Sequence, residues 1–292
     1  MAEIETKVRN LAELLRCPAC HADLAAGESE LKCGSGHGPF LVDKNGRAHL
    51  ILGDVSEYQG EHLRGVNWLK SFLKRWPRLY YFVWHIFCPV LMSDKGPRSI
   101  LPLVSSSNPL IINLGSGPKR IGREFVNLDV FPFAEVDVVA DAHHLPFADN
   151  SVDAVFNESL LEHVANPLAA VLEIARVIKP GGIIYTSAPF MTPYHASPDD
   201  FGRWTKSGLK TLFSNFEPVE EGVASGPWSA LLVFLAYFLG VVFSFGSRKL
   251  APFLAFVFMI ILGPLKIFDF IFARFPGADA VSAQLYFIGR KR

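Results

Sequence analysis

Three cysteines and one histidine near the N-terminus have the spacing of a metal site. Two residues separate Cys17 from Cys20, twelve separate Cys20 from Cys33, and three separate Cys33 from His37. These pairs supply three thiolates and one imidazole, the ligand set of a closed tetrahedral zinc site. His21 directly follows Cys20 and is a poorer geometric choice than His37. We therefore expect structural zinc, with a metal-free pair of cysteines in a turn as the alternative.

A second group of residues has the types that hold a nucleotide-like cofactor. An apolar run at 110–112 leads into a polar turn, and a second apolar run ends in Asp129. The turn residues are Asn113, Gly115, Ser116 and Gly117. Glycines let the backbone approach a ligand closely, and a strand-end carboxylate accepts hydrogen bonds from ribose hydroxyls. The pattern predicts a cofactor-binding enzyme, although Gly-x-Gly turns end many strands and Asp129 could be a plain turn residue.

The elements that position these residues alternate between strand and helix. Three further buried strands are predicted at the apolar runs 137–141, 152–156 and 183–188. Before the last of them, Asn166 is a good N-cap with Pro167 at the first helical position, and the helical spacing continues to a break at 179–182. This alternation predicts an α/β fold whose mainly parallel sheet binds ligands at the carboxyl ends of its strands.

The order of these motifs resembles that of the class I S-adenosylmethionine-dependent methyltransferases. Two stretches carry the resemblance, Asp141-Ala142-His143-His144-Leu145-Pro146-Phe147 and Leu161-Glu162-His163-Val164-Ala165-Asn166-Pro167. The resemblance spans about residues 108–222 and implies a Rossmann-like sheet with S-adenosylmethionine as cofactor. Two departures stand out: Asn113 replaces the acid usual before the glycines, and 118–124 is too short for a full first helix. We therefore expect a more open cofactor pocket.

The same resemblance implies roles for individual residues at the strand ends. The glycine turn would line the methionine part of the cofactor, and Asp129 would hold the ribose. Asp141 with Ala142 would face the adenine, and a helix or turn cap is the alternative for Asp141. Asn157 and Glu158, just past the fourth strand, would face the donor sulfonium and the acceptor.

Acceptor chemistry is expected in the loop after the fifth strand. Methyl transfer is an in-line displacement, so a base is needed only if the nucleophile must lose a proton. His195 is the candidate base or acceptor ligand, and Asp199 and Arg203 could orient it or bind a polar head. His163 could shape the pocket, and ordinary loop or packing contacts are the alternative for each residue. The loop is similar to one in methyltransferase-like proteins associated with cell-surface polysaccharide and lipid biosynthesis.

The metal motif carries a resemblance of its own over residues 15–52. With Gly38-Pro39-Phe40 and the stretch 46–50, it resembles the N-terminal zinc domain of bacterial ribosomal RNA guanine methyltransferases. It is similar, more loosely, to the small zinc-ribbon activators of RNA and protein methyltransferases. In those relatives the zinc domain helps to recognise or support the substrate. A ribbon this small folds largely through its metal.

Composition limits the substrate classes and locates an insertion. The 28 Lys and Arg residues balance 28 Asp and Glu residues, whereas RNA-binding enzymes normally carry a basic field, so nucleic acid is not the expected partner. Hydrophobic residues make up 50% of the chain and gather at 228–245 and 250–263. These runs lie between a predicted sixth strand at 216–223 and a seventh at 280–288. We expect an apolar helical insertion at 226–275.

This insertion predicts a membrane-facing surface. The uncharged run 228–245 is near the minimum for a span, roughly 17 to 25 residues. A crossing hairpin would place Arg248 and Lys249 on the far side, against the positive-inside tendency, so a shallow or interfacial hairpin competes with it. A homodimer interface, or a cap over a lipid-like substrate, is the soluble alternative. The aromatic and basic segment 68–92 suits the same headgroup region.

The predicted organisation has three parts. A zinc-ribbon lobe at 1–52 is followed by a linker with an aromatic amphipathic helix at 53–107, and then by a methyltransferase domain at 108–292. No cleavable signal is evident and the cysteine usage suits a reducing compartment, so the cytoplasmic face of a membrane is expected. The leading function is methyl transfer to a lipid-linked or glycan acceptor near that membrane. An RNA base methyltransferase and a non-catalytic membrane scaffold are the alternatives.

Overall fold

The computed structural model describes residues 13–27, 29–53, 86–93, 95–194 and 199–292. His195 lies outside the described residues, as does most of the aromatic and basic segment predicted at 68–92.

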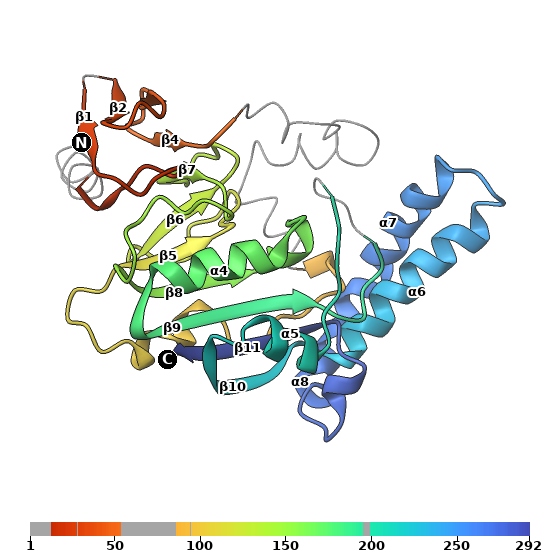
Figure 1. Cartoon of the computed structure of the whole chain (residues 1–292). Coiled ribbons are helices and arrows are strands. Elements are labelled where there is room, and N and C mark those ends of the chain that lie inside the picture. Colours follow the sequence, from red (N-terminus) through yellow and green to blue (C-terminus); the bar gives the residue numbers. More distant parts are fainter. Residues whose placement is uncertain (1–12, 28, 54–85, 94, 195–198) are drawn as a thin grey trace.

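An eight-stranded sheet forms the centre of the protein (Figure 1). Its strand order is β10-β11-β9-β8-β5-β6-β7-β4. The strands are β4 (Ala48–Leu50), β5 (Ile111–Leu114), β6 (Phe125–Asp129), β7 (Val138–Ala140), β8 (Val152–Glu158), β9 (Ile178–Pro189), β10 (Phe216–Ser225) and β11 (Gln284–Lys291). β11 is antiparallel to β9 and β10, and the other pairings in the sheet are parallel. This mainly parallel order confirms the predicted class I methyltransferase, Rossmann-like fold.

The carboxyl ends of the strands meet at one edge of the sheet. β10 runs in the same direction as β9 because both are antiparallel to β11. The turns and loops that follow β5, β6, β7, β8, β9 and β10 therefore lie along a single edge. We refer to it below as the carboxyl edge.

Two capped helices follow β8 and β9. α4 (Pro167–Val177) packs against the sheet and starts as predicted, since the Asn166 side chain accepts a hydrogen bond from the backbone nitrogen of Ala169. α5 (Lys206–Leu212) starts at Thr205, which accepts from Gly208. β9 begins earlier than the predicted strand at 183–188 because the chain re-enters the sheet at Ile178, directly after α4. A register shift follows, and there Gly181 adopts a φ of +77°.

An ion-pair network stands where a first helix is usual. The described stretch 118–124 contains no helix, as its length predicted. The Arg120 guanidinium instead reaches Glu135 at 3.0 Å and Asp137 at 2.9 Å, and it donates to the carbonyl oxygen of Phe125. These contacts fix the short connection to the loop between β6 and β7.

The N-terminal lobe is joined to the central sheet. Its own small sheet contains β1 (Leu24–Ala26), β2 (Glu30–Cys33) and β3 (Phe40–Leu41). The next strand, β4, pairs with β7 and so becomes the edge strand of the central sheet (Figure 1). Leu31, Phe40 and Leu50 belong to the same buried cluster as the strands of the sheet. The lobe therefore shares its core with the rest of the protein.

The insertion between β10 and β11 is a helical hairpin, as predicted. α6 (Pro227–Phe243) packs against α7 (Leu250–Leu262), which continues through the 3-10 turn η5 (Gly263–Phe268) into α8 (Asp269–Phe272). A Cβ at Gly240 would lie 2.8 Å from the Cβ of Ala255, so the two helices approach very closely there. Figure 1 shows the hairpin projecting from the body of the protein.

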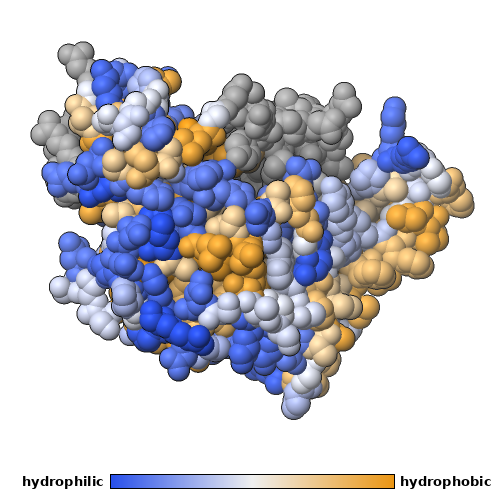
Figure 2. All heavy atoms as spheres, viewed as in Figure 1, coloured by the Kyte–Doolittle hydropathy of each residue, from blue (hydrophilic) through white to orange (hydrophobic). Residues whose placement is uncertain are grey.

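The outer surface of the hairpin is apolar (Figure 2). Large hydrophobic side chains with half or more of their surface exposed include Leu231, Phe234, Phe238, Val241, Phe253 and Ile261. The far end is hydrophilic in Figure 2 and carries Arg248 and Lys249 in the connection between the helices. The run Leu250–Phe272 has the length and composition of a membrane-spanning helix, and only 17% of its apolar window is buried.

Candidate cofactor and acceptor site

The glycine turn after β5 has a backbone that requires glycine. Gly115 and Gly117 adopt φ angles of +70° and +58°, a region that other residues rarely occupy. A Cβ at Gly115 would lie 2.8 Å from the side chain of Leu160, whereas one at Gly117 would meet nothing within 4 Å. The turn is therefore packed on one side and open on the other. Ser116, between the two glycines, donates its hydroxyl to the carbonyl oxygen of Gly117.

Asp129, at the end of β6, holds this turn in place. Its carboxylate accepts hydrogen bonds from the backbone nitrogens of Gly117 at 2.8 Å and Phe131 at 2.9 Å. Burial raises the pKa of Asp129, while these backbone donors oppose the rise. The structure therefore brings the predicted ribose ligand directly against the glycine turn.

Asn113 lies beneath the turn and makes its observed contact inside the sheet. Its side chain is buried and donates to the side-chain oxygen of Asn127, on the adjacent strand, at 3.0 Å. Its role toward a cofactor stays a prediction.

The loop after β7 places Asp141 beside a histidine. The Asp141 carboxylate accepts from the backbone nitrogen of His143 at 2.9 Å and pairs with His143 Nδ1 at 2.7 Å. This hydrogen bond raises the pKa of His143. Ala142, the residue between Asp141 and His143, is buried. The predicted adenine-side residues thus form a short, polar turn at the carboxyl edge.

Unpaired polar atoms gather where β8 and β9 end. Asn157 is fully buried, and its oxygen accepts from the hydroxyl of Thr186 at 2.6 Å, but its Nδ2 has no partner among the described residues. The hydroxyl of Ser187, buried on β9, likewise lacks one. Ser159 follows with a φ of +54°, a strained value for serine, and accepts a hydrogen bond from Gln284 of β11. Glu158 is exposed at the same edge.

Arg203 fixes the described part of the loop after β9. Arg203 forms a two-pronged ion pair with Asp200, with Nη2 and Oδ2 2.6 Å apart. It also donates to the carbonyl oxygens of Thr192 and Pro193. His163 Nδ1 donates to the carbonyl oxygen of the exposed Asp199 at 2.5 Å. The structure therefore brings three of the four predicted acceptor-side residues together at the contact between this loop and the turn after β8.

Sequence reasoning missed Glu162, which lies in the 3-10 turn η4 (Leu161–His163). Its side chain is fully buried, and neither carboxyl oxygen has a hydrogen-bond partner within the described chain. Burial raises the pKa of Glu162 to about 8. The residue sits inside the Leu161–Pro167 motif, but a glutamate in a short polar motif gives no sign that its carboxyl will be buried.

The four predicted metal ligands form one cluster in the N-terminal lobe. The ligand atoms of Cys17, Cys20, Cys33 and His37 all lie within 4.8 Å of one another. Cys20 Sγ is 3.5 Å from Cys33 Sγ, and His37 Nδ1 is 3.7 Å from the sulfurs of both Cys17 and Cys33. Such separations fit tetrahedral bonds of about 2.1 to 2.3 Å around zinc. The backbone nitrogen of Ser35 lowers the pKa of Cys33 to about 6, which favours the thiolate.

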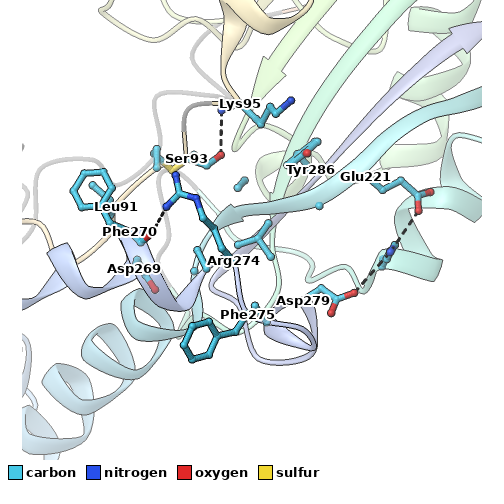
Figure 3. A pocket seen from close by; sticks show the side chains of 18 residues that line it. Leu91, Ser93, Lys95, Glu221, Asp269, Phe270, Arg274, Phe275, Asp279 and Tyr286 are labelled. Atoms are coloured by element: carbon cyan, nitrogen blue, oxygen red, sulfur yellow. Dashed lines mark hydrogen bonds and ion pairs between the residues drawn. The ribbon is translucent and has the colours of Figure 1, made fainter.

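A cavity of about 370 Å³ lies at the base of the hairpin (Figure 3). Lys206 lies between Glu221 and Asp279, at 3.9 and 3.7 Å, and Arg274 extends toward Leu91 and the carbonyl of Phe270. None of the predicted cofactor residues lines this cavity. It is therefore distinct from the glycine turn.

The strand-end acids Asp129 and Asp141 lie in a part of the chain that matches a known family. Residues 120–186 match the family described as Methyltransferase domain. The matched region includes β6 to β8, α4 and most of β9.

Among curated proteins, the ubiquinone/menaquinone biosynthesis C-methyltransferase UbiE of Coxiella burnetii is 34% identical over 109 residues. That match covers 36% of this chain and 43% of the relative. A demethylmenaquinone methyltransferase of Corynebacterium glutamicum is 50% identical over 56 residues, covering 19% and 24%. The chain thus spans less than half the length of these relatives. Among solved structures, phosphoethanolamine N-methyltransferase 2 of Haemonchus contortus aligns at 15% identity with a TM-score of 0.42, covering 76% of this chain and 59% of that one.

Proposed function

We propose that this protein transfers a methyl group from S-adenosylmethionine to a lipid-type acceptor held at a membrane surface. The observation that carries the proposal is the position of the apolar hairpin. α6 starts at Pro227, directly after β10 ends at the carboxyl edge. On the return side of the hairpin, Ala283 and Ser282 accept backbone hydrogen bonds from Phe190 and Met191 in the loop after β9. The segment that returns from the hairpin to β11 is therefore hydrogen-bonded to the start of the proposed acceptor loop.

The residues at the carboxyl edge suit the proposed cofactor. The open side of Gly117 leaves the backbone accessible, and Asp129 presents a carboxylate directly beside it. The unpaired Nδ2 of Asn157 offers a buried donor at the end of the next strand. When bound, S-adenosylmethionine would supply an activated methyl group. The chain itself would then have to hold an acceptor in line and exclude water, which the loop clamped by Arg203 could do.

The acceptor class is supported from two sides. Several of the similar curated proteins carry names in quinone biosynthesis, which concerns lipid-type molecules. The hairpin exposes large apolar side chains over most of its length, more than a water-soluble surface normally tolerates. The 17 residues of α6 are about 25 Å long, shorter than a hydrocarbon core of about 30 Å. We therefore favour a hairpin that lies along the interface of the cytoplasmic face without crossing, which keeps Arg248 and Lys249 near headgroups.

Two other functions are separable by experiment. An RNA base methyltransferase would be favoured by salt-sensitive RNA retention, but the chain has a formal net charge of zero. A non-catalytic scaffold, recruiting a partner through the zinc lobe, would show no cofactor binding. The lack of a helix at 118–124 favours a scaffold, but the Arg120 ion pairs hold this connection firmly in place.

The test begins with calorimetry of S-adenosylmethionine binding to detergent-purified protein. Gly115→Arg and Asp129→Ala should each abolish micromolar binding. The first places a large side chain in the glycine turn, and the second removes the carboxylate that holds the turn in place. Gly96→Ala is the matched control, since Gly96 has an ordinary φ of −121° and open space around its Cβ. Transfer of tritiated methyl groups into vesicles of total bacterial membrane lipid then tests the acceptor class. Absence of cofactor binding by folded protein would overturn the enzyme proposal, and binding without organic-extractable label would overturn the acceptor class.

A further inference from the structure

Glu162 is a buried carboxyl group without a hydrogen-bond partner among the described residues. It is the second residue of η4, and its side chain has no exposed surface. Neither of its oxygens is hydrogen-bonded within the portion of the chain that the structure describes. An isolated carboxylate in such a place is strongly disfavoured, whereas a neutral carboxylic acid is tolerated. An acid of this kind is sensitive to any new charge placed nearby.

The charged groups around Glu162 already balance one another. Asp200, whose side chain is 1% exposed, faces it from the loop after β9 and is paired with Arg203. The Asp200 charge disfavours ionisation of Glu162, while the Arg203 charge favours it. From its own turn, His163 Nε2 lies 4.0 Å from Glu162 Oε1. Burial outweighs the contributions that favour the ionised form and raises the pKa of Glu162 to about 8.

Glu162 is also fixed at the carboxyl edge. The backbone nitrogen of Phe201 donates to the Glu162 carbonyl oxygen at 2.7 Å, so the loop after β9 covers the turn. The chain from Glu158 to Glu162 is short and includes the strained Ser159. The turn that carries Glu162 is therefore held close to the end of β8, where Asn157 and Glu158 are predicted to face the sulfonium, and the Glu162 carboxyl is shielded from water.

We propose that Glu162 selects the charged methyl donor over its neutral product by gaining and losing a proton. This inference rests on the proposed function. Glu162 is neutral before the donor binds, and its O–H bond breaks when a sulfonium cation occupies the neighbouring site, with the proton passing to solvent. After transfer the sulfur is neutral, and the Glu162 carboxylate takes a proton back from solvent. The carboxylate stabilises only the complex with the charged donor and not the complex with the neutral product, so the product leaves more easily.

Calorimetry in two buffers of different ionisation enthalpy tests this coupling by a readout other than activity. At pH 7 the wild type should release close to one proton per S-adenosylmethionine bound and almost none with S-adenosylhomocysteine. Glu162→Gln should still bind both ligands but release no proton with either. Loss of one charge interaction should reduce the preference for the donor by about tenfold. Glu217→Gln, an exposed site on β10, is the matched control and should behave as wild type.

The outcomes separate this inference from the proposed function. Donor binding by the wild type without proton release, or release that persists in Glu162→Gln, would overturn it, and the second result would assign the proton to a histidine such as His163. Should Glu162→Gln fold poorly, the wild type alone decides: release present at pH 7 must vanish at pH 9, where Glu162 is already ionised. Absence of donor binding by folded wild type would instead overturn the proposed function itself.

Discussion

The carboxylate of Asp269 accepts a hydrogen bond from the backbone nitrogen of Trp228 at 2.9 Å, across 41 residues of sequence. Its second oxygen accepts from Ser229 at 2.8 Å. Both nitrogens lie in the first turn of α6, which has no side-chain cap of its own because Gly226 occupies the N-cap. Asp269, the first residue of α8, therefore caps the N-terminus of α6 and joins the last helix of the hairpin to the first. A Cβ at Gly226 would overlap this carboxylate, so only glycine fits there.

Asp269→Ala should loosen the base of the hairpin. The substitution removes two charge-assisted hydrogen bonds and leaves two buried backbone nitrogens unpaired, so we expect a loss of about 1 to 3 kcal/mol in the free energy of unfolding. Urea denaturation in detergent measures it. Glu217→Ala changes an exposed acid on β10 and is the control. Equal midpoints for the two variants would show that the cap contributes nothing.

Removal of the metal should affect more than the N-terminal lobe. Cys17 and Cys33 belong to the buried cluster that includes the central sheet, and the backbone nitrogen of Arg16 donates to Pro146 in the loop after β7. We expect about one zinc per chain, and a melting temperature lower by several degrees in Cys33→Ser. Cys88→Ser, which changes the cysteine outside the cluster, should keep both metal and stability. Elemental analysis and thermal unfolding test this, and a metal-free wild type would contradict it.

Much of the fold could be predicted from the sequence because its signals are local. Glycines at 115 and 117, the Asn166-Pro167 cap and the apolar runs each fix a turn, a helix start or a buried strand. The pairing of β4 with β7 could not be predicted, because the sequence of a three-residue strand does not specify a distant partner strand. The cap made by Asp269 is missed for the same reason.

The positions of the site residues follow from the sequence only in part. Asp129 and Asp141 lie at strand ends, as their place in the sequence indicates, and their roles toward a cofactor stay predictions. Sequence alone could not show that Arg203 is engaged by Asp200 and two carbonyl groups. Nor could it show that the Glu162 carboxyl is buried without a hydrogen-bond partner in the described chain. Both depend on how the loop after β9 folds over the turn after β8, which is a tertiary contact.

Glu162 should make the stability of the protein depend on pH. Its folded-state pKa of about 8 lies above the ordinary value of 4.5, so the folded protein binds this proton more tightly than the unfolded chain does. The contribution of Glu162 is complete below pH 4.5 and is lost as pH rises toward 8. Relative to Glu162→Gln, the free energy of unfolding of the wild type should fall by up to about 1.4 kcal/mol per pH unit across this window. Urea unfolding at pH 5, 6, 7 and 8 measures the difference, and parallel curves would refute the expectation.

Vesicle binding should depend on the apolar face of the hairpin. Phe234 and Phe238 expose 63% and 55% of their surface on α6, one turn apart on the same face. If this face enters the lipid, replacing both with glutamate places two charges among acyl chains, and the bound fraction should fall by at least tenfold. Leu41→Glu is the matched control, because Leu41 is equally exposed, at 63%, but lies on β3 in the N-terminal lobe. Co-sedimentation with phosphatidylglycerol and phosphatidylethanolamine vesicles measures binding. If the double variant still sediments while a change in oligomeric state appears by light scattering, the apolar face is a contact between two copies of the chain instead.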